Sequence, residues 1–359
     1  MGKLLGLALL MVALGLWPRR AGGLELHVER AYHALVNSPD LVIFGGVAGY
    51  FGGKGNRDEG CSEADFLRLS LQLWHATRNA QYLEFAERCL FNHFFGNQFR
   101  TGDFGHHLLC REGFAPLLGT GRAWWYCTMH GLRAFRDVLD SMVTCDEHGM
   151  KVELFLDGEC RAGDFHARME GHTIESGLMY EIRVENAPLS EFSISLRVPP
   201  WASEVNARIN GCVEPLHIRE GYQTASRRWE KGDILSVDFA LATRLMGRDG
   251  ESIELGSMGR EPIEAALWCG PWLLGVHEAK NPLFFGEPWQ ENVVVLPAAL
   301  RFSKDRGSEP LDTPLGKVKL PYLHGGFPDS GVVVLQPVSA RTQYEQSAAA
   351  VWLHYCRGE

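Results

Sequence analysis

The chain has 359 residues, of which 45% are hydrophobic and 22% charged, enough for about two or three domains, each with its own core. Its formal net charge of −9, without any long Lys/Arg run, argues against nucleic acid as a partner. Nine cysteines, an odd number without dense spacing, argue against a fold held together throughout by disulfides.

The N-terminus allows two interpretations. Lys3, the apolar run at residues 4–16 and the small residues at 21–23 are typical of a secretory signal peptide over residues 1–23. The apolar run is too short for a stable membrane span. A signal peptide predicts a secreted protein, and its absence a cytoplasmic one.

An internal repeat favours the second interpretation. The pattern Leu-Gly-Leu-Trp at residues 14–17 and the charged residues after it are echoed about 57 residues later by Leu-Gln-Leu-Trp at residues 71–74. Such self-similarity is typical of stacked helical hairpins. We therefore favour a helical hairpin over the first 37 residues.

The second copy has the clearer helical pattern. Ser62, followed three residues later by Asp65, is typical of a helix start, and apolar residues then recur at helical spacing. Arg78 and Asn79 are predicted to form the turn to a second helix. His93 lies on the apolar stripe of that helix, so we interpret it as a core histidine rather than a ligand.

The next segment, residues 96–121, has no period and is rich in Gly, His and Phe, which predicts a long loop. Loops of this length are usually functional or disordered. His106 and His107 in this loop are candidates for contact with a ligand, although paired histidines in loops are also often only solvated. A further helix is predicted over residues 129–142.

Glu59, Cys61 and Cys127 are candidate metal ligands. Glu59 and Cys61 stand two apart in a Gly-rich segment, and Cys127 follows a run of three aromatic residues. Carboxylate and thiolate are ordinary zinc ligands, and a zinc-bound thiol is deprotonated. Free cysteines are nevertheless mostly buried small hydrophobes, so a metal site and core thiols remain alternatives on spacing alone.

After residue 149 the pattern changes to short β-rich runs. Seven of them are predicted as strands, at residues 151–156, 165–169, 180–184, 192–198, 205–209, 222–227 and 234–239. Asn210-Gly211 predicts a tight hairpin after the fifth run. Strands spaced this closely predict a β-sandwich. Residues 265–276 add further strands, and the region from residue 281 onward is β-rich but weakly patterned.

Several motifs in a fixed order resemble a known family. They are Glu59-x-Cys61, Trp125-Tyr126-Cys127 with Arg133, Leu196-Arg197-Val198-Pro199-x-Trp201-Ala202, Asn210-Gly211, Gly221-Tyr222, Trp229-x-x-Gly232-Asp233 and Gly270-Pro271. Together they resemble the β-L-arabinofuranosidases of glycoside hydrolase family 127 (GH127), over about residues 45–276.

The resemblance implies an α+β multidomain fold, in which an (α/α)6 barrel of six helical hairpins precedes β-sandwich domains. In this chain it predicts a partial barrel, or helical toroid, at residues 1–147 and a β-sandwich at residues 148–280. Residues 281–359 would form an incomplete second sandwich. Roughly five helices fit before the sandwich, so the open toroid should expose an apolar edge and self-associate through residues 1–95.

The resemblance also implies a zinc site and shows where this chain departs from it. Glu59, Cys61 and Cys127 match the zinc ligands, whereas Tyr126 stands where the family has its nucleophilic Cys. The family's general-acid Glu lies in the segment that corresponds to residues 45–58. That segment holds no Glu here, and its only acidic residue, Asp58, is the candidate acid.

Other residues near these motifs allow two roles each. His130 could be a fourth zinc ligand or a helix-surface histidine. Trp124 and Trp125 could stack on a sugar face, although one of them could belong to the core. Glu63 and Asp65 could act as acid or base, but their place at a helix start is also explained by the helix dipole.

We therefore expect a glycoside hydrolase-like protein, related to retaining β-L-arabinofuranosidases, with a carbohydrate as substrate or ligand and an eroded active site. In an intact relative, a zinc-tuned thiolate would attack the anomeric carbon while a carboxylic acid protonates the leaving oxygen. Two alternatives remain: a non-catalytic carbohydrate-binding or scaffold protein, and a fragment of a longer glycosidase.

Overall fold

The computed structural model describes residues 22–49, 57–99, 101–115, 124–175, 177–216, 218–286, 288–303, 315–324, 327–340 and 348–358. The predicted signal peptide covers residues 1–23, of which only residues 22 and 23 are described. The first copy of the repeat, at residues 14–17, lies outside the described residues. None of the described helices combines the length and the apolar composition needed to cross a membrane.

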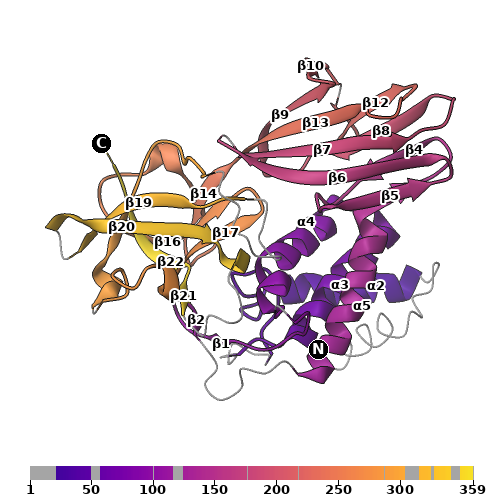
Figure 1. Ribbon diagram of the computed structural model, residues 1–359. Coiled ribbons are helices and arrows are strands. Elements are labelled where there is room, and N and C mark those ends of the chain that lie inside the picture. Colours follow the sequence, from indigo (N-terminus) through magenta and orange to yellow (C-terminus); the bar gives the residue numbers. More distant parts are fainter. Residues whose placement is uncertain are drawn as a thin grey trace. The chain divides into compact units, whose positions relative to one another are not determined.

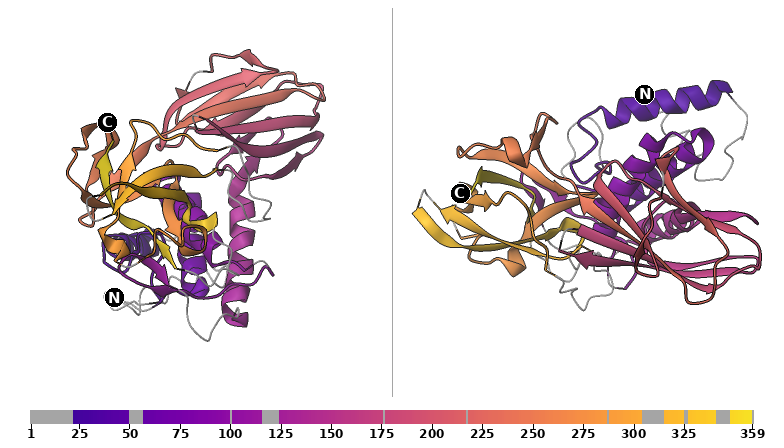
Figure 2. Two further views of the ribbon diagram at one scale, coloured as in Figure 1. Left: turned by 60° about the vertical axis from the view of Figure 1, so that its left-hand side comes forward. Right: turned by 90° about the horizontal axis from the view of Figure 1, so that it is seen from above.

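The described residues form two compact units, drawn in Figures 1 and 2. Unit 1 consists of Met1–Val138, Pro271–Pro282 and Val338–Trp352, and unit 2 consists of Leu139–Gly270, Leu283–Pro337 and Leu353–Glu359. The domain boundaries predicted at residues 147 and 280 stay a prediction.

Four α-helices lie within the described residues: α2 (Gly22–Val36), α3 (Gly60–Thr77), α4 (Ala80–Cys89) and α5 (Trp125–Met142). Short helical turns add η1 (Leu90–Phe94), η2 (Phe95–Asn97), η3 (Leu255–Ser257), η4 (Glu278–Lys280), η5 (Trp289–Glu291) and η6 (Val338–Ala340). Helix α5 begins at Trp125, four residues before the predicted start at residue 129, so Tyr126 and Cys127 lie in its first turn.

The α3–α4 hairpin turns where the sequence predicts. Arg78 ends α3 in the left-handed conformation, with a φ of 57°, and the Asn79 side chain caps α4 by accepting the Gln81 N–H at 3.1 Å. The predicted start at Ser62 is wrong, because α3 begins at Gly60. The Ser62 N–H donates to the backbone carbonyl of Glu59 (2.9 Å), so Ser62 already lies inside the first turn.

The core of unit 1 joins these helices to strands. Tyr32 of α2 stacks on Phe66 of α3 with ring centroids 5.5 Å apart, and its hydroxyl bonds Ser70 at 2.8 Å. Asn92 of η1 donates to the Pro271 carbonyl (2.8 Å) and accepts the Leu273 N–H (2.7 Å). The strands of this unit pair in the order β1 (Leu108–Leu109), β2 (Gly113–Ala115), β21 (Ala349–Ala350) and β17 (Trp272–His277).

The predicted fold class, a partial (α/α)6 helical toroid, is therefore wrong. The described chain is strand-rich and has only four α-helices. Amphipathic periodicity predicts that a helix has a buried face, but it does not say which element covers that face. Strand β17 packs beside η1 in this unit, and Asn92 forms hydrogen bonds with the backbone of Pro271 and Leu273. In a toroid, a further helical hairpin would cover η1 instead.

Unit 2 contains three sets of strands, many of which are labelled in Figure 1. The six-stranded sheet has the order β10 (Cys212–Val213), β9 (Ala202–Ile209), β13 (Ile234–Leu241), β7 (Gly177–Asn186), β6 (Phe165–Ile174) and β5 (Gly158–Ala162). The five-stranded sheet has the order β11 (Ile218–Arg219), β12 (Tyr222–Arg227), β8 (Phe192–Arg197), β4 (Gly149–Val152) and β3 (Val143–Cys145). The third set has the order β20 (Phe327–Pro337), β19 (Val318–His324), β18 (Val293–Leu296), β22 (Trp352–Arg357), β16 (Ile263–Cys269), β14 (Thr243–Met246) and β15 (Ser252–Glu254).

The predicted strand runs are found, with two instructive details. Asn210 and Gly211 take positive φ angles of 52° and 81° between the antiparallel strands β9 and β10, as the hairpin prediction requires. The run predicted at residues 151–156 stops at Val152, because the N–H groups of Glu153 and Leu154 donate to the Met142 carbonyl instead of a neighbouring strand. Phe165 of β6 stacks on Phe192 of β8 with centroids 4.2 Å apart, so apolar side chains fill the space between the two sheets.

Candidate functional site

Unit 1 brings the three candidate zinc ligands together at the starts of two helices. Cys61 lies in the first turn of α3, and its Sγ is 3.5 Å from Oε2 of Glu59. The thiols of Cys61 and Cys127 are hydrogen-bonded to each other. A Cβ atom on Gly60 would lie 3.4 Å from the Cys127 Cβ and 3.1 Å from that of Phe104, so the missing side chain lets α3 and α5 approach closely. We call Glu59, Cys61 and Cys127 the sulfur cluster.

His106 extends the sulfur cluster on the side of Cys127. Its Nε2 is 3.8 Å from the Cys127 Sγ, and its Nδ1 is 3.1 Å from the backbone carbonyl of Asp58. Its ring also contacts Trp124 edge-on, with centroids 5.2 Å apart. The sequence predicted His106 as a sugar contact and did not predict its place beside Cys127, since the loop that carries it has no periodicity from which its neighbours follow.

The thiol pair is polarised. The hydrogen bond from Cys61 lowers the pKa of Cys127 to about 5, and the contact with His106 adds to this effect. The hydrogen bond to Cys127 and burial raise the pKa of Cys61 well above its ordinary value. Burial alone would lower the pKa of His106, but the neighbouring Cys127 thiolate raises it above the ordinary value. Cys127 is therefore the more acidic thiol of the pair, although its side chain is buried.

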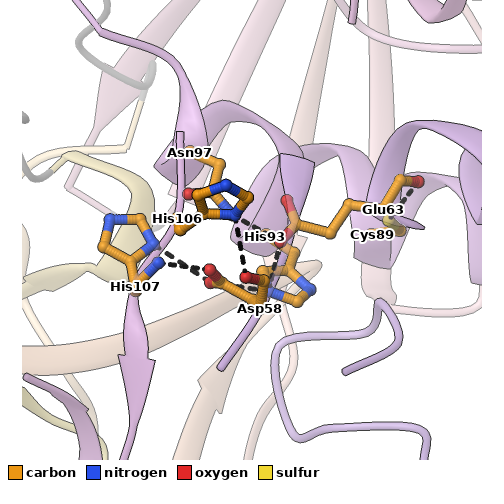
Figure 3. Close-up of polar contacts among 7 residues, drawn as sticks. All are labelled: Asp58, Glu63, Cys89, His93, Asn97, His106 and His107. Atoms are coloured by element: carbon orange, nitrogen blue, oxygen red, sulfur yellow. Dashed lines mark hydrogen bonds and ion pairs between the residues drawn. The ribbon is translucent and has the colours of Figure 1, made fainter. Parts of the chain in front are cut away.

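A second polar cluster lies deeper in unit 1, where Asp58 connects two histidines (Figure 3). Asp58 Oδ2 is 3.0 Å from Nδ1 of His107 and 3.2 Å from Nε2 of His93, and its Oδ1 accepts the His107 N–H. His93 Nε2 also lies 2.9 Å from Oε1 of Glu63, which accepts from the Asn97 side chain. All five side chains are buried, and we call them the buried cluster.

Charges in the buried cluster depend on one another. Burial alone would raise the pKa of Asp58, but His107 and His93 together hold it well below its usual range. Burial raises the pKa of Glu63 to about 7. Burial alone would lower the pKa of His93, but Glu63 and Asp58 raise it to about 9. Asp58 is thus an ionised, enclosed carboxylate that has no proton to donate at neutral pH.

The sequence missed the buried cluster as a unit. It placed His93 in the core and explained Glu63 by its helix-start position, while Asp58 and His107 belonged to separate loops. The i, i+4 spacing of His93 and Asn97 puts both on one face of the η1–η2 turn, which is the only local signal that relates two members.

Both clusters contain groups that can bind metals. Among the described residues, Asp58, Glu63 and His93 form the group whose ligand atoms all lie within 4.8 Å of one another. His93 Nε2 already bridges the two carboxylates there, so each group has a partner without an ion. The sulfur cluster has the donor types that zinc prefers, and its Cys61–Glu59 spacing of 3.5 Å fits ligands of a single ion. The donor types of the sulfur cluster therefore fit zinc, while its ligand atoms do not all lie within 4.8 Å of one another.

The remaining predicted residues lie at the exposed end of α5. Trp124, Trp125 and Tyr126 are all exposed. The Tyr126 ring lies against His130, with centroids 4.8 Å apart. His130 Nδ1 is 3.0 Å from Oδ1 of Asp65, so the structure pairs this predicted ligand with Asp65 on α3. Tyr126 and His130 stay predictions as nucleophile position and metal ligand.

Comparison with known proteins supports the resemblance inferred from the motifs. Residues 150–241 match the family model described as the middle domain of GH127 β-L-arabinofuranosidase. The fold is similar to the crystal structure of Ara127N-Se, a GH127 β-L-arabinofuranosidase from Geobacillus stearothermophilus T6, with a TM-score of 0.63 and 14% identity. A GH127 β-arabinofuranosidase, BT3674, gives a TM-score of 0.62 at 16% identity, and another glycoside hydrolase gives 0.61 at 14%.

These similarities extend over nearly all of the present chain but only part of the others. The chain is covered to 99%, 92% and 94%, whereas Ara127N-Se, BT3674 and the third hydrolase are covered to 59%, 57% and 66%. A comparison with curated proteins finds no match. The predicted resemblance to GH127 is thus confirmed by the matched middle domain and by the fold.

Proposed function

We propose that the chain recognises a carbohydrate through a GH127-like site in which Tyr126 stands in the nucleophile's place, and that it hydrolyses glycosides weakly or not at all. One similar solved structure is a β-L-arabinofuranosidase by name and another is a β-arabinofuranosidase, so β-L-arabinofuranosides are the first ligands to test. The observation that carries the proposal is the contrast in exposure between Tyr126 and Cys127, neighbours in the first turn of α5.

A nucleophile must reach the anomeric carbon of its substrate. The Cys127 side chain, the only thiol of this pair of neighbours, is 2% exposed, whereas Tyr126 is 52% exposed. Tyrosine hydroxyls ordinarily keep their proton at neutral pH and are not zinc ligands of the thiolate kind. The accessible position therefore lacks a thiol, and the neighbouring thiol is not accessible.

General acid catalysis is also poorly supplied. The segment at residues 45–58 contains no Glu, and Asp58 is enclosed by His107 and His93. The low pKa of Asp58 leaves it ionised at neutral pH, which is the wrong state for protonating a leaving oxygen. Binding of a sugar without efficient turnover is the function that this arrangement supports.

Two groups of residues would serve the site. The exposed rings of Trp124 and Trp125 offer apolar faces on which a sugar ring can stack. The sulfur cluster would hold a zinc ion between the starts of α3 and α5. When bound, zinc would keep its thiol ligands deprotonated and fix the relative position of these two helix ends.

Hydrolysis of an aryl β-L-arabinofuranoside tests the catalytic half of the proposal. We expect no turnover above background for the unaltered chain and for Tyr126→Phe. Tyr126→Cys should produce only weak activity, because a missing general acid alone commonly costs about 10²–10⁴-fold in rate. Substantial turnover by the unaltered chain that is abolished in Tyr126→Phe would instead identify the tyrosine as a working nucleophile.

Calorimetric titration with arabinose-containing oligosaccharides tests the binding half. Trp125→Ala should weaken binding because it removes the most exposed ring of α5, whereas Leu189→Ala removes a similarly exposed side chain in unit 2 and should not. If no arabinose-containing ligand binds, the carbohydrate assignment fails, and a scaffold role is then favoured.

A further inference from the structure

We propose that His106, through Nε2, is the fourth ligand of the metal site formed with Glu59, Cys61 and Cys127. The inference rests on the proposed zinc site and adds a residue that the sequence did not connect with it. It assigns the role of fourth metal ligand to a residue of the loop before α5 and not to Tyr126 or His130.

The spacing of the donor atoms supports the assignment. In a tetrahedral site the distance between two ligand atoms is about 1.6 times the metal–ligand bond, so zinc bonds of about 2.0–2.3 Å require spacings of about 3.3–3.8 Å. The Cys61 Sγ to Glu59 Oε2 distance is 3.5 Å, and the Cys127 Sγ to His106 Nε2 distance is 3.8 Å. The hydrogen bond between the two thiols joins these pairs into one row of four donors.

The second nitrogen of His106 supports it independently. Nδ1 lies 3.1 Å from the Asp58 carbonyl oxygen, which can only accept, so Nδ1 donates a proton there. Nε2, which faces Cys127, is then the ring nitrogen left to bind a metal, once any proton that it shares with Cys127 is lost. Metal-binding histidines typically donate their other N–H to a carbonyl or carboxylate in this way. The Asp58 backbone is itself fixed, because its N–H donates to the His107 carbonyl at 3.1 Å.

The two competing residues are engaged elsewhere. His130 Nδ1 is 3.0 Å from Asp65, whose carboxylate is also 3.7 Å from the Arg68 guanidinium. The Tyr126 ring lies beside His130 rather than beside the thiols. Among the described residues, the hydrogen bonds and ring contacts of His130 and Tyr126 go to other partners, whereas His106 contacts Cys127.

The four donors form an open row rather than a closed tetrahedron. Within the described part of the chain, Asp58, Glu63 and His93 are the three residues whose ligand atoms all lie within 4.8 Å of one another. The four donors of the proposed site do not meet this condition. The inner pair, Cys61 and Cys127, is buried, while the outer pair, Glu59 and His106, is partly exposed. A metal would therefore bind to the thiols and draw the two outer side chains inward.

Cobalt substitution of the full chain tests the inference without relying on activity. Metal-stripped protein is loaded with Co²⁺, the thiolate-to-cobalt absorption band is recorded, and zinc affinity is measured by competition with a chelator. We expect His106→Gln to weaken zinc binding at least tenfold, since even second-shell changes typically cost about 10–100-fold. It should also shift the cobalt spectrum, while His130→Gln should change neither quantity.

X-ray absorption of the zinc-loaded protein adds a direct count of ligands. Two sulfur and two lighter ligands are expected, with an imidazole signature that disappears in His106→Gln and persists in His130→Gln. The unfolding temperature of each metal-free variant checks that both still fold.

Failure of the inference can be separated from failure of the zinc site. If the chain binds zinc through Cys61 and Cys127, as Cys61→Ala reveals, but His130→Gln rather than His106→Gln removes the imidazole signature, His106 is not the ligand. If the unaltered chain binds no stoichiometric zinc or cobalt, the metal site itself is overturned and the inference falls with it.

Discussion

At the scale of single residues, His93 determines how the buried cluster responds to pH. It lies between Asp58 and Glu63 at 3.2 Å and 2.9 Å, without exposure to solvent. Two carboxylates around one imidazole favour its protonated form, which is why the pKa of His93 rises to about 9 despite burial. The folded chain therefore holds a proton that an unfolded chain releases near pH 6.5.

The stability contributed by this proton should be fully present below pH 6.5 and be lost as the pH rises through about 9. Glu63 acts in the same direction at lower pH, because its pKa is raised from 4.5 to about 7 and its ionisation is unfavourable in the folded chain. We expect the free energy of unfolding to fall between pH 6.5 and 9 by up to about 1.4 kcal/mol per pH unit.

Denaturant unfolding at several pH values measures this slope. His93→Gln should flatten it above pH 6.5, whereas His148→Gln, which changes an exposed histidine, should leave it as it is. An equal slope in the unaltered chain and in His93→Gln would contradict the prediction.

At the scale of elements, two cysteines from different sheets of unit 2 lie side by side. Cys145 in β3 belongs to the five-stranded sheet, and Cys160 in β5 to the six-stranded sheet. Their Sγ atoms are 3.0 Å apart, and the Cys145 thiol is hydrogen-bonded to Cys160, whose pKa this contact lowers. Both residues are free in the structure, and Cys145 is exposed to reagents.

We expect these two cysteines to form a disulfide when the chain is treated with a small disulfide such as oxidised glutathione. The exposed Cys145 attacks the reagent as its thiolate and releases one thiol, and Cys160 then attacks the mixed disulfide and displaces the second. Closing a loop of 15 residues should raise the free energy of unfolding by about 3 kcal/mol.

Peptide mapping with and without reductant identifies the cross-link, and unfolding of both forms gives its energy. Cys145→Ser should abolish both effects, and Cys212→Ser, at another exposed cysteine, should abolish neither. Stable free thiols at both positions after treatment would show that the pair cannot close.

At the scale of the whole molecule, helix α5 carries an exposed apolar row. Met129, Leu132 and Leu139 are between 53% and 64% exposed. Their separations of three and seven residues place them on one face of the helix, at the spacing of a coiled-coil seam. The sequence predicted self-association through residues 1–95, and this row is the better candidate within the described residues.

We expect two copies of the chain to pair through this row, because an identical stripe is complementary to itself across a two-fold axis. Leu132→Glu should produce a monomer in sedimentation velocity at concentrations where the unaltered chain is dimeric. Leu189→Glu, at another exposed leucine, serves as the control. If the unaltered chain is monomeric at high concentration, self-association through residues 1–95 and pairing through α5 are both contradicted.

Much of the local structure follows from short segments of sequence. Asn210-Gly211 specifies its hairpin because both residues tolerate positive φ. The strand predicted at residues 222–227 matches β12, because its alternating β-rich pattern can be recognised within the segment itself. Arg78-Asn79 ends one helix and caps the next for the same reason. The ordered motifs also sufficed to predict the resemblance to GH127 that the middle-domain match supports.

Contacts between distant segments were decided only by the tertiary structure. The approach of His106 to Cys127, and of Asp58 to His93, depends on where a loop without periodicity crosses the starts of α3 and α5. The helical toroid failed for a related reason, since an amphipathic helix specifies its buried face but not its partner, and here Asn92 joins that face to strand β17. Local sequence determines which backbone conformations are low in energy, whereas the neighbours of a buried polar group depend on the packing of the whole unit.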